Sequence, residues 1–195
     1  LIVEEVKLML KQMSKSKLDN LIKFLWMSGQ LKRIPRSGWT EAGVDSPESV
    51  ADHTFRTSII CMVFSDLEGL DELKMLRMAL LHDLPEAITG DLTPSERTEE
   101  TAKNEEESMQ QLLSLLPETL KERYTKLWRE YAEGKTEEAK AVRELEKLEM
   151  TLQAREYKKI QPTLEGLERF IESADRVITT PRVRSILSYI LNSDH

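Results

Sequence analysis

Residues 71–88 of this 195-residue chain read DELKMLRMALLHDLPEAI, and this stretch indicates the fold class. Its apolar residues recur three and four positions apart, which is the period of an amphipathic helix. Pro85 lacks an N–H group and would clash with the preceding turn, so the helix should end or kink near Leu84. The predicted buried face consists of Leu73, Leu76, Leu80 and Leu81.

The helical period continues toward the N-terminus. An apolar stripe marks one helix, which ends at Gly29, and a basic, irregular loop should follow over residues 32–39. Ser46 and Pro47 suit the N-cap and first position of a second helix that runs to about Leu67. The stripe consists of Leu18, Leu21, Ile22 and Leu25.

The remaining sequence is also helical in pattern, without a convincing strand. Thr93-Pro94 should cap one helix, Pro117 should start the next, and Gly134 should end it. The last three helices are expected at about 136–158, at 164–173, and from Thr180-Pro181 onward. We therefore predict an all-α single domain of about seven helices over residues 1–195. Its core should span about 18–160, with C-terminal helices 163–191 packed on it.

Composition excludes several classes of protein. The chain has 28 Lys+Arg and 35 Asp+Glu, a formal charge of -7, which disfavours binding to a nucleic-acid polymer but leaves room for a small phosphate pocket. A single cysteine, Cys61, cannot form an intramolecular disulfide and favours a cytoplasmic location. No apolar run approaches the roughly 20 residues that span a bilayer. Residues 1–10, LIVEEVKLML, lack the basic start of a secretory signal, so no membrane partner is expected.

Three histidines occur, and His195 is the last residue, so any metal site depends on His53 and His82. Asp83 follows His82 directly, and Glu86 and Asp91 come shortly after. Two imidazoles with carboxylates suit Mn, Co, Fe or Mg and leave coordination positions open for water. The alternative is a core histidine with a satisfied hydrogen bond, because a His-Asp dipeptide alone has little specificity.

Longer segments around these histidines are more specific. They read PESVADH at 47–53 and LLHDLPEAITGD at 80–91. Both resemble the HD-domain phosphohydrolases, and more closely their 5'-deoxynucleotidase branch, the HD-domain-containing protein 2 family. The resemblance extends from about Leu21 to Tyr157, and it implies a helical HD-domain bundle. It also includes LKR at 31–33, RSGW at 36–39 and EMTLQAREY at 149–157.

This resemblance implies that His53, His82 and Asp83 bind a divalent metal, for which Mn, Co and Mg remain open. The family's fourth ligand is an aspartate on a late helix, and the EMTLQAREY alignment places Glu146 at that position. Glutamate is one methylene longer, so the metal could shift, change coordination or bind less tightly. The alternative for Glu146 is a solvated helix face.

Two further acids resemble catalytic residues of the family. Glu86 corresponds to a glutamate that orients a metal-bound water and takes its proton. Asp91 corresponds to an acid that assists proton transfer to the leaving 5'-oxygen. The alternative for Asp91 is a loop Asx-turn.

Phosphate recognition requires local cations in this acidic chain. Lys32, Arg33 and Arg36 lie in the predicted loop, and an arginine fork suits phosphate oxygens. The alternative is a solvated basic loop. Trp39 resembles the family tryptophan beside the substrate sugar, where it could exclude a 2'-hydroxyl group; otherwise it is a packing aromatic.

The leading functional interpretation is metal-dependent hydrolysis of deoxyribonucleoside 5'-monophosphates by a metal-activated water. One alternative keeps the site but changes the substrate to a cyclic nucleotide, an alarmone or a nucleoside triphosphate. Another is a non-catalytic helical binding module with a weakened metal site. The resemblance also implies a homodimer, for which the C-terminal helix offers an apolar face of Val183, Ile186, Leu187, Tyr189 and Ile190.

Overall fold

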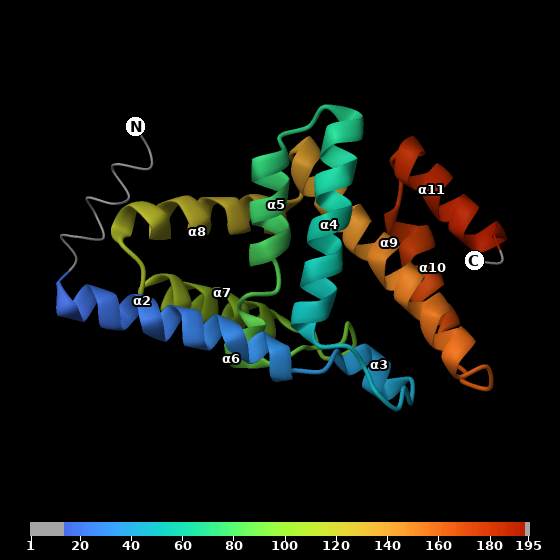
Figure 1. Ribbon diagram of the computed structural model, residues 1–195, viewed down its shortest axis with the longest axis horizontal. Helices are drawn as coiled ribbons and strands as arrows, with labels where there is room; N and C mark the ends of the chain where they lie inside the picture. Colours follow the sequence, from blue (N-terminus) through green and yellow to red (C-terminus); the bar gives the residue numbers. More distant parts are fainter. Residues whose placement is uncertain (1–13, 194–195) are drawn as a thin grey trace.

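The computed structural model describes residues 14–193, which form helices joined by short loops and contain no strand (Figure 1). The all-α prediction is therefore confirmed, whereas LIVEEVKLML and His195 lie outside the described residues. Eight described helices have ten residues or more, close to the predicted seven: α2 (Lys15–Ser28), α4 (Val50–Glu68), α5 (Glu72–Leu81), α7 (Glu99–Leu113), α8 (Glu118–Glu133), α9 (Glu137–Ile160), α10 (Glu168–Val177) and α11 (Pro181–Asn192). Three short helices are η1 (Gly29–Arg33), α3 (Ser37–Glu41) and α6 (Glu86–Thr89).

Helix α9 is the centre of the fold, since it packs against α4, α5, α8, α10 and α11. Figure 1 shows α4 and α5 side by side across α9, with α10 and α11 toward one end of the molecule and α2, α7 and α8 toward the other. The start of α4 and the end of α5 thereby come close to the middle of α9. Between residues 14 and 193, no helix is both long enough and apolar enough to cross a bilayer.

The start of α4 differs from the prediction. Val50 is its first residue and Ser49 its N-cap, so the assignment of Ser46 and Pro47 was wrong. The Asp52 N–H donates to Ser49 Oγ at 3.2 Å, and the Ser49 N–H donates to Asp52 Oδ2 at 2.9 Å. This reciprocal capping box satisfies two free N–H groups, so the helix begins here.

The start of α7 also differs. Thr98 caps this helix, because its Oγ1 accepts from the Thr101 N–H, and the predicted cap at Thr93 was wrong. Thr93 instead donates from its N–H and its hydroxyl to Glu96 Oε2, at 2.8 and 2.9 Å, which closes a local turn. The predicted irregular loop at 32–39 likewise contains the end of η1 and the start of α3.

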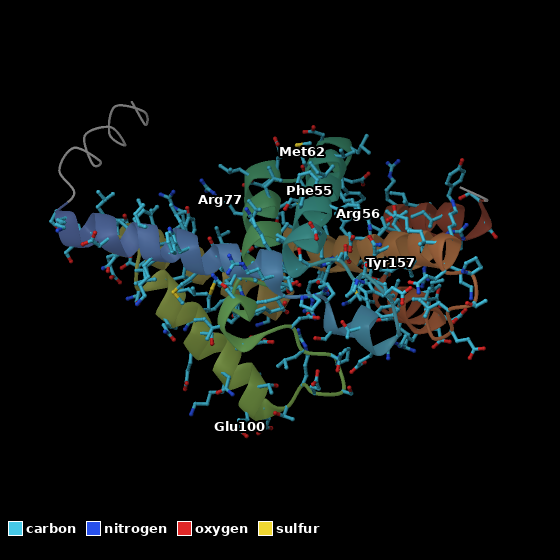
Figure 2. The ribbon with its side chains drawn as sticks, turned by 60° about the horizontal axis from the view of Figure 1, so that its bottom comes forward. Phe55, Arg56, Met62, Arg77, Glu100 and Tyr157 are labelled. Carbon is cyan, nitrogen blue, oxygen red and sulfur yellow. The ribbon has the colours of Figure 1, made fainter. Side chains whose placement is uncertain are left out.

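Helix α5 buries only part of the predicted face: Leu81 is buried and Leu76 is half-buried, but the other two leucines are not. Leu73 and Leu80 are each 55% exposed, whereas Met75, Met78 and Ala79 are fully buried. The reason is that α4 and α9 both pack on the methionine side. Figure 2 shows Phe55, Met62 and Arg77 on the α4–α5 pair. We call the exposed apolar side chains of this pair the outer face: Phe55, Ile59, Val63, Leu67, Leu73 and Leu80.

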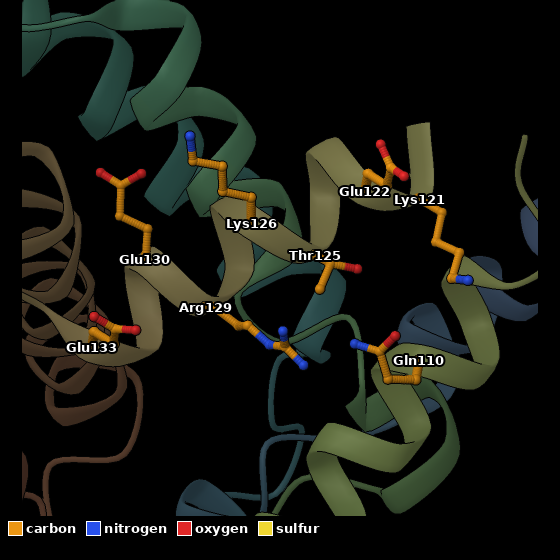
Figure 3. Close-up of a pocket in the computed structure, with 8 residues that line it drawn as sticks. All are labelled: Gln110, Lys121, Glu122, Thr125, Lys126, Arg129, Glu130 and Glu133. Carbon is orange, nitrogen blue, oxygen red and sulfur yellow. The ribbon is translucent and has the colours of Figure 1, made fainter. Parts of the chain in front are cut away.

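Helices α7 and α8 border an open hollow of about 650 Å³ with mostly charged walls (Figure 3). Three of its lining residues are basic and three are acidic, and none is a site residue predicted from the sequence. The hollow is lined by Gln110, Lys121, Glu122, Thr125, Lys126, Arg129, Glu130 and Glu133.

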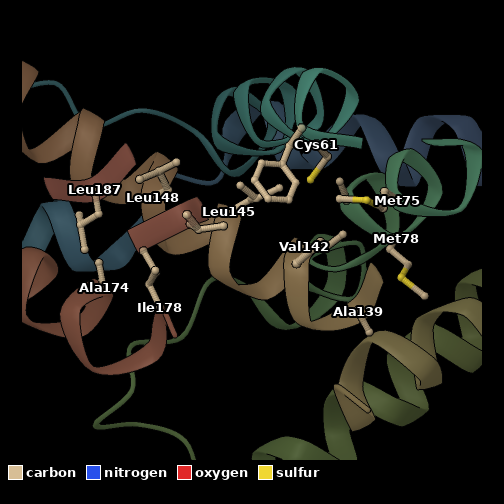
Figure 4. Packing of buried hydrophobic residues seen from close by; sticks show 14 residues of the cluster. Cys61, Met75, Met78, Ala139, Val142, Leu145, Leu148, Ala174, Ile178 and Leu187 are labelled. Atoms are coloured by element: carbon tan, nitrogen blue, oxygen red, sulfur yellow. The ribbon is translucent and has the colours of Figure 1, made fainter. Parts of the chain in front are cut away.

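The largest apolar cluster surrounds α9 (Figure 4). Val142 and Leu145 of α9 meet Cys61 of α4, and they also meet side chains of α5, α10 and α11. Helix α11 contributes Val183 and Leu187, both essentially inaccessible to solvent. The apolar face of the C-terminal helix therefore packs largely within the chain.

Candidate metal centre

The two internal histidines meet Asp83 between α4 and α5. Asp83 Oδ2 lies 3.9 Å from His53 Nε2 and 3.0 Å from His82 Nε2. One ligand atom from each residue lies within 4.8 Å of the others. Both Nε2 atoms are buried and have no hydrogen-bond partner within residues 14–193. Buried nitrogens are normally paired, so this convergent donor set fits a divalent cation.

Hydrogen bonds on the far side of each ring fix the orientation of both imidazoles. His82 Nδ1 contacts the Ala79 carbonyl at 2.6 Å, and His53 Nδ1 contacts Glu149 Oε2 at 2.5 Å. A carbonyl or a carboxylate can only accept, so Nδ1 is the donor in each neutral ring. The Nε2 lone pairs are thereby left free to bind metal.

Glu149 is a site residue that the sequence analysis missed. Its side chain is fully buried on α9, and Oε1 accepts from Arg56 Nε at 2.9 Å. Burial alone would raise the pKa of Glu149, but His53 and Arg56 outweigh that effect and hold the pKa below its ordinary value. Its spacing of three residues from Glu146, which places both on one side of a helix, was the available signal.

Glu146 lies near this group but is not one of the three converging residues. Its carboxylate accepts from the Tyr131 hydroxyl at 2.6 Å and from Lys147 Nζ at 2.8 Å. Its side chain is only 12% exposed, so the alternative of a solvated helix face does not apply. The sequence analysis also missed Tyr131. Its ring lies edge-on against the His82 ring, with the ring centroids 5.6 Å apart.

A cavity of about 420 Å³ opens beside His82 and Asp83, and Glu86, Asp91, Arg36 and Glu146 also line it. We call it the metal-side cavity. Arg36 Nη1 lies 2.6 Å from Asp91, 3.1 Å from Asp83 and 3.7 Å from Glu86. One cation therefore sits among three carboxylates, where a phosphate group could approach it.

Glu86 begins α6 immediately after Pro85, and its side chain is buried. Its Oε2 has no hydrogen-bond partner among the residues that the structure describes. Burial, and then the Asp83 carboxylate, raise the pKa of Glu86 to about 10, although Arg36 acts in the opposite direction.

Asp91 connects the cavity to the start of α3. Its Oδ2 accepts from the Ser37 N–H at 2.5 Å, and its backbone carbonyl accepts from the Ser37 hydroxyl at 2.7 Å. These bonds cross between segments far apart in sequence, so the side chain does not make the local Asx-turn considered as the alternative. Asp91 instead holds the Arg36-Ser37 segment against the cavity.

The remaining predicted residues lie in different surroundings. Trp39 is almost fully buried, donates from Nε1 to Glu48 Oε1 at 2.9 Å, and packs on Phe170 with ring centroids 3.8 Å apart. It also lines a cavity that adjoins Arg36. Lys32 and Arg33 are exposed, and neither is among the residues that line these two cavities.

These features define an all-α protein with a His-His-Asp cluster beside a carboxylate-lined cavity. The HD-domain family model matches residues 28–182, and the chain therefore belongs to the HD-domain family. It is similar to the 5'-deoxynucleotidase HDDC2 of Mus musculus, at 40% identity over 86% of this chain and 85% of that protein. The Homo sapiens protein of the same name is 39% identical over 87% and 83% of the two chains. A Pyrococcus horikoshii protein of known crystal structure superposes with a TM-score of 0.74 at 34% identity, covering 87% of this chain and 97% of that one.

Proposed function

We propose that this HD-domain protein is a metal-dependent phosphohydrolase that removes the 5'-phosphate from deoxyribonucleoside 5'-monophosphates. The observation that carries the proposal is the convergence of two unpartnered histidine nitrogens and Asp83 beside a cavity that holds Arg36 and Glu86. The relatives named 5'-deoxynucleotidase, at up to 40% identity over most of the chain, support this substrate class.

His53, His82 and Asp83 would hold the divalent cation, which is Mn, Co or Mg. Glu146, which lines the same cavity, is our candidate for a fourth ligand. When bound, such a cation lowers the pKa of a coordinated water and polarises the phosphate.

The protein's own side chains supply the remaining chemistry. Glu86, once ionised, accepts the proton of the attacking water and orients that water toward phosphorus. Arg36 offsets the charge of the phosphoryl oxygens, and Asp91 positions Arg36 and assists proton transfer to the leaving oxygen. Trp39 limits the space beside the sugar 2'-carbon, and Arg33 adds positive charge outside the cavity.

The test is phosphate release by metal-stripped protein after Mn, Co or Mg is added back singly. Matched deoxyribonucleoside and ribonucleoside 5'-monophosphates are compared. We expect metal-dependent turnover confined to the deoxy series, and a loss of about 10²–10⁴-fold for Glu86→Gln. Glu107→Gln is the matched control, because Glu107 is an exposed glutamate on α7.

Three outcomes separate the possibilities. Equal turnover of both series would leave the hydrolase but remove the role given to Trp39. Turnover of a cyclic nucleotide, an alarmone or a triphosphate alone would change the substrate. No turnover with any metal or substrate would refute the proposal and favour the binding-module alternative.

We also propose that the chain forms a cytoplasmic homodimer through the outer face of α4 and α5. Six large apolar side chains about half exposed leave on the order of 600 Å² of apolar surface. This area is at the upper limit of the exposed apolar patches found on monomeric proteins. It is near the roughly 800 Å² that each partner contributes to a standard interface. The cytoplasmic location is supported by the single cysteine, Cys61, which is buried and unpaired.

A further inference from the structure

The position of the Trp39 ring depends on contacts from outside its own helix. Trp39 lies on α3, a helix of five residues that begins directly after Arg36. A helix this short has little stability of its own, so neighbouring elements must fix its side chains. The indole ring is 1% exposed, and its centroid lies 3.8 Å from that of Phe170 and 5.3 Å from that of Tyr157. Apolar packing is non-directional, so it does not by itself fix the rotation of the ring.

Glu48 supplies the directional contact. Trp39 Nε1 donates to Glu48 Oε1 at 2.9 Å. An indole N–H can only donate, and a buried donor that loses its acceptor is costly, so this bond constrains the ring strongly. Glu48 lies in the segment that leads into α4, the helix that carries His53. One hydrogen bond therefore ties the Trp39 ring to the element that holds the first histidine of the metal centre.

The backbone of Glu48 holds the phosphate side of the site. The Arg36 N–H donates to the Glu48 carbonyl at 2.9 Å, and the Val50 N–H donates to the Ile34 carbonyl at 2.9 Å. These two bonds pair the segment before α3 with the segment before α4. The Glu48 N–H in turn donates to the Tyr157 hydroxyl at 2.7 Å. Substitution of Glu48 therefore removes the side-chain contact to the indole ring but leaves the backbone bonds in place.

The Glu48 carboxylate also lies close to His53 and Glu149, since one ligand atom of each is within 4.8 Å of the others. These donors already have partners, because Glu48 Oε1 accepts from Trp39 and Glu149 Oε2 contacts His53 Nδ1. The His53 nitrogen without a hydrogen-bond partner is Nε2, which lies 3.9 Å from Asp83 Oδ2. Glu48 therefore acts as an acceptor for Trp39 rather than as a ligand of a second cation.

We propose that Glu48 is a positioning residue for selection of the sugar. The inference rests on the proposed function, in which Arg36 binds phosphate and Trp39 limits the space beside the sugar 2'-carbon. A side chain that excludes one hydroxyl group must be held to within about 0.5 Å relative to the phosphate site. Glu48 sets this separation, because it binds both residues. It lines neither the metal-side cavity nor the adjoining cavity that Trp39 lines, so it acts through Trp39.

The kinetic test uses a ratio, kcat/KM for deoxyguanosine 5'-monophosphate divided by kcat/KM for guanosine 5'-monophosphate. We expect Glu48→Ala to lower this ratio at least about tenfold, because the freed ring no longer excludes the 2'-hydroxyl group. The ratio does not depend on the fraction of folded enzyme, so a variant that is merely less stable leaves it unchanged. Glu48→Gln keeps an accepting oxygen and should keep the ratio within about twofold. Glu107→Ala, at an exposed position of α7, is the matched control.

A second readout does not require turnover. In NMR hydrogen-exchange measurements the Trp39 indole N–H, identified by its loss in Trp39→Phe, should exchange slowly in the wild type and in Glu48→Gln. In Glu48→Ala it should exchange at least about tenfold faster, because its acceptor is gone. The Trp128 indole N–H, which donates to the His82 carbonyl at 3.3 Å, is the internal reference and should stay unchanged.

The outcomes distinguish this inference from the proposed function. If neither nucleotide is turned over, the hydrolase is refuted, and calorimetric affinities for the two nucleotides replace the kinetic ratio. A preference for the deoxynucleotide in binding that Glu48→Ala abolishes would then still support the positioning role. No such preference in the wild type, or an unchanged ratio or unchanged Trp39 exchange in Glu48→Ala, would overturn it. A loss of the ratio in Glu48→Gln as large as in Glu48→Ala would overturn it as well.

Discussion

Glu149→Gln is the substitution that best tests how α9 supports the metal centre. The Glu149 carboxylate is fully buried and receives two N–H groups, from His53 Nδ1 at 2.5 Å and from Arg56 Nε at 2.9 Å. Glutamine has nearly the same shape but only one accepting oxygen. Its NH₂ group must therefore face one of the two donors, and the negative charge that polarises His53 is lost.

The expected magnitude follows from these contacts. Loss of an outer-shell partner of a ligating histidine typically lowers metal affinity 10–100-fold, which corresponds to about 1.4–2.7 kcal/mol. One buried donor without an acceptor lowers the free energy of unfolding by roughly 1–3 kcal/mol. For a chain of this length each kcal/mol corresponds to about 2–4 °C in Tm.

Calorimetric titration of metal-stripped protein with Mn measures the affinity, and chemical denaturation of the same protein measures the stability. The control is Glu156→Gln, because Glu156 is the other carboxylate that binds Arg56, at 2.8 Å, and is 53% exposed. The affinity of the Glu156→Gln variant for Mn should stay within about twofold of the wild type, since His53 keeps its partner Glu149. Unchanged Mn affinity in Glu149→Gln, or an equal loss in Glu156→Gln, would refute the reasoning.

Arg36→Ala should lower kcat/KM for deoxyribonucleoside monophosphates by about 10²-fold or more in phosphate-release assays, because it removes the cation nearest the cavity acids. Glu146→Asp introduces the aspartate that the family resemblance gives for the fourth ligand, in place of the longer side chain that Tyr131 holds. Calorimetry should therefore show about tenfold tighter Mn binding, and weaker binding would contradict this. The pKa of Glu86 is raised to about 10, above its unfolded value. Denaturation should therefore show metal-free wild type losing stability as the pH rises from about 5 toward 10, a slope absent in Glu86→Gln. Val63→Glu on the outer face should give a monomer by light scattering, and a persistent dimer would place the interface elsewhere.

Local apolar pattern, together with capping residues, prolines and glycines, was sufficient to predict the long helices in outline, but it missed the short helices η1, α3 and α6. It was insufficient for their starts and for one buried face. Ser46 and Ser49 are both good N-caps by type, and only Ser49 has Asp52 three residues later to complete the capping box. Leu73 and Leu80 follow a helical period on the side opposite α9, and periodicity alone does not say where the neighbouring helices lie.

Some residues of the site could be predicted from the local sequence, and others could not because tertiary packing brings them there. His82 and Asp83 are adjacent in sequence, and their family-like surroundings predicted them together with His53. Tyr131 has no such motif, and Glu149 begins the EMTLQAREY segment but received no role from it. Both residues reach the site because α8 and α9 pack against the α4–α5 pair. Supporting residues of this kind depend on tertiary packing.

The position of Arg36 links metal binding to phosphate recognition. Its Nη1 contacts Asp83 and Asp91 and lies near Glu86, so these carboxylates balance its charge. A divalent cation held by His53, His82 and Asp83 would offset the charge of Asp83, and part of the Arg36 charge would become available to an anion. The contribution of Arg36 to phosphate affinity should therefore itself depend on whether the metal is bound. In an acidic chain with a formal charge of -7, a bound cation would therefore reduce the competition between the cavity carboxylates and an anionic substrate for the same guanidinium group.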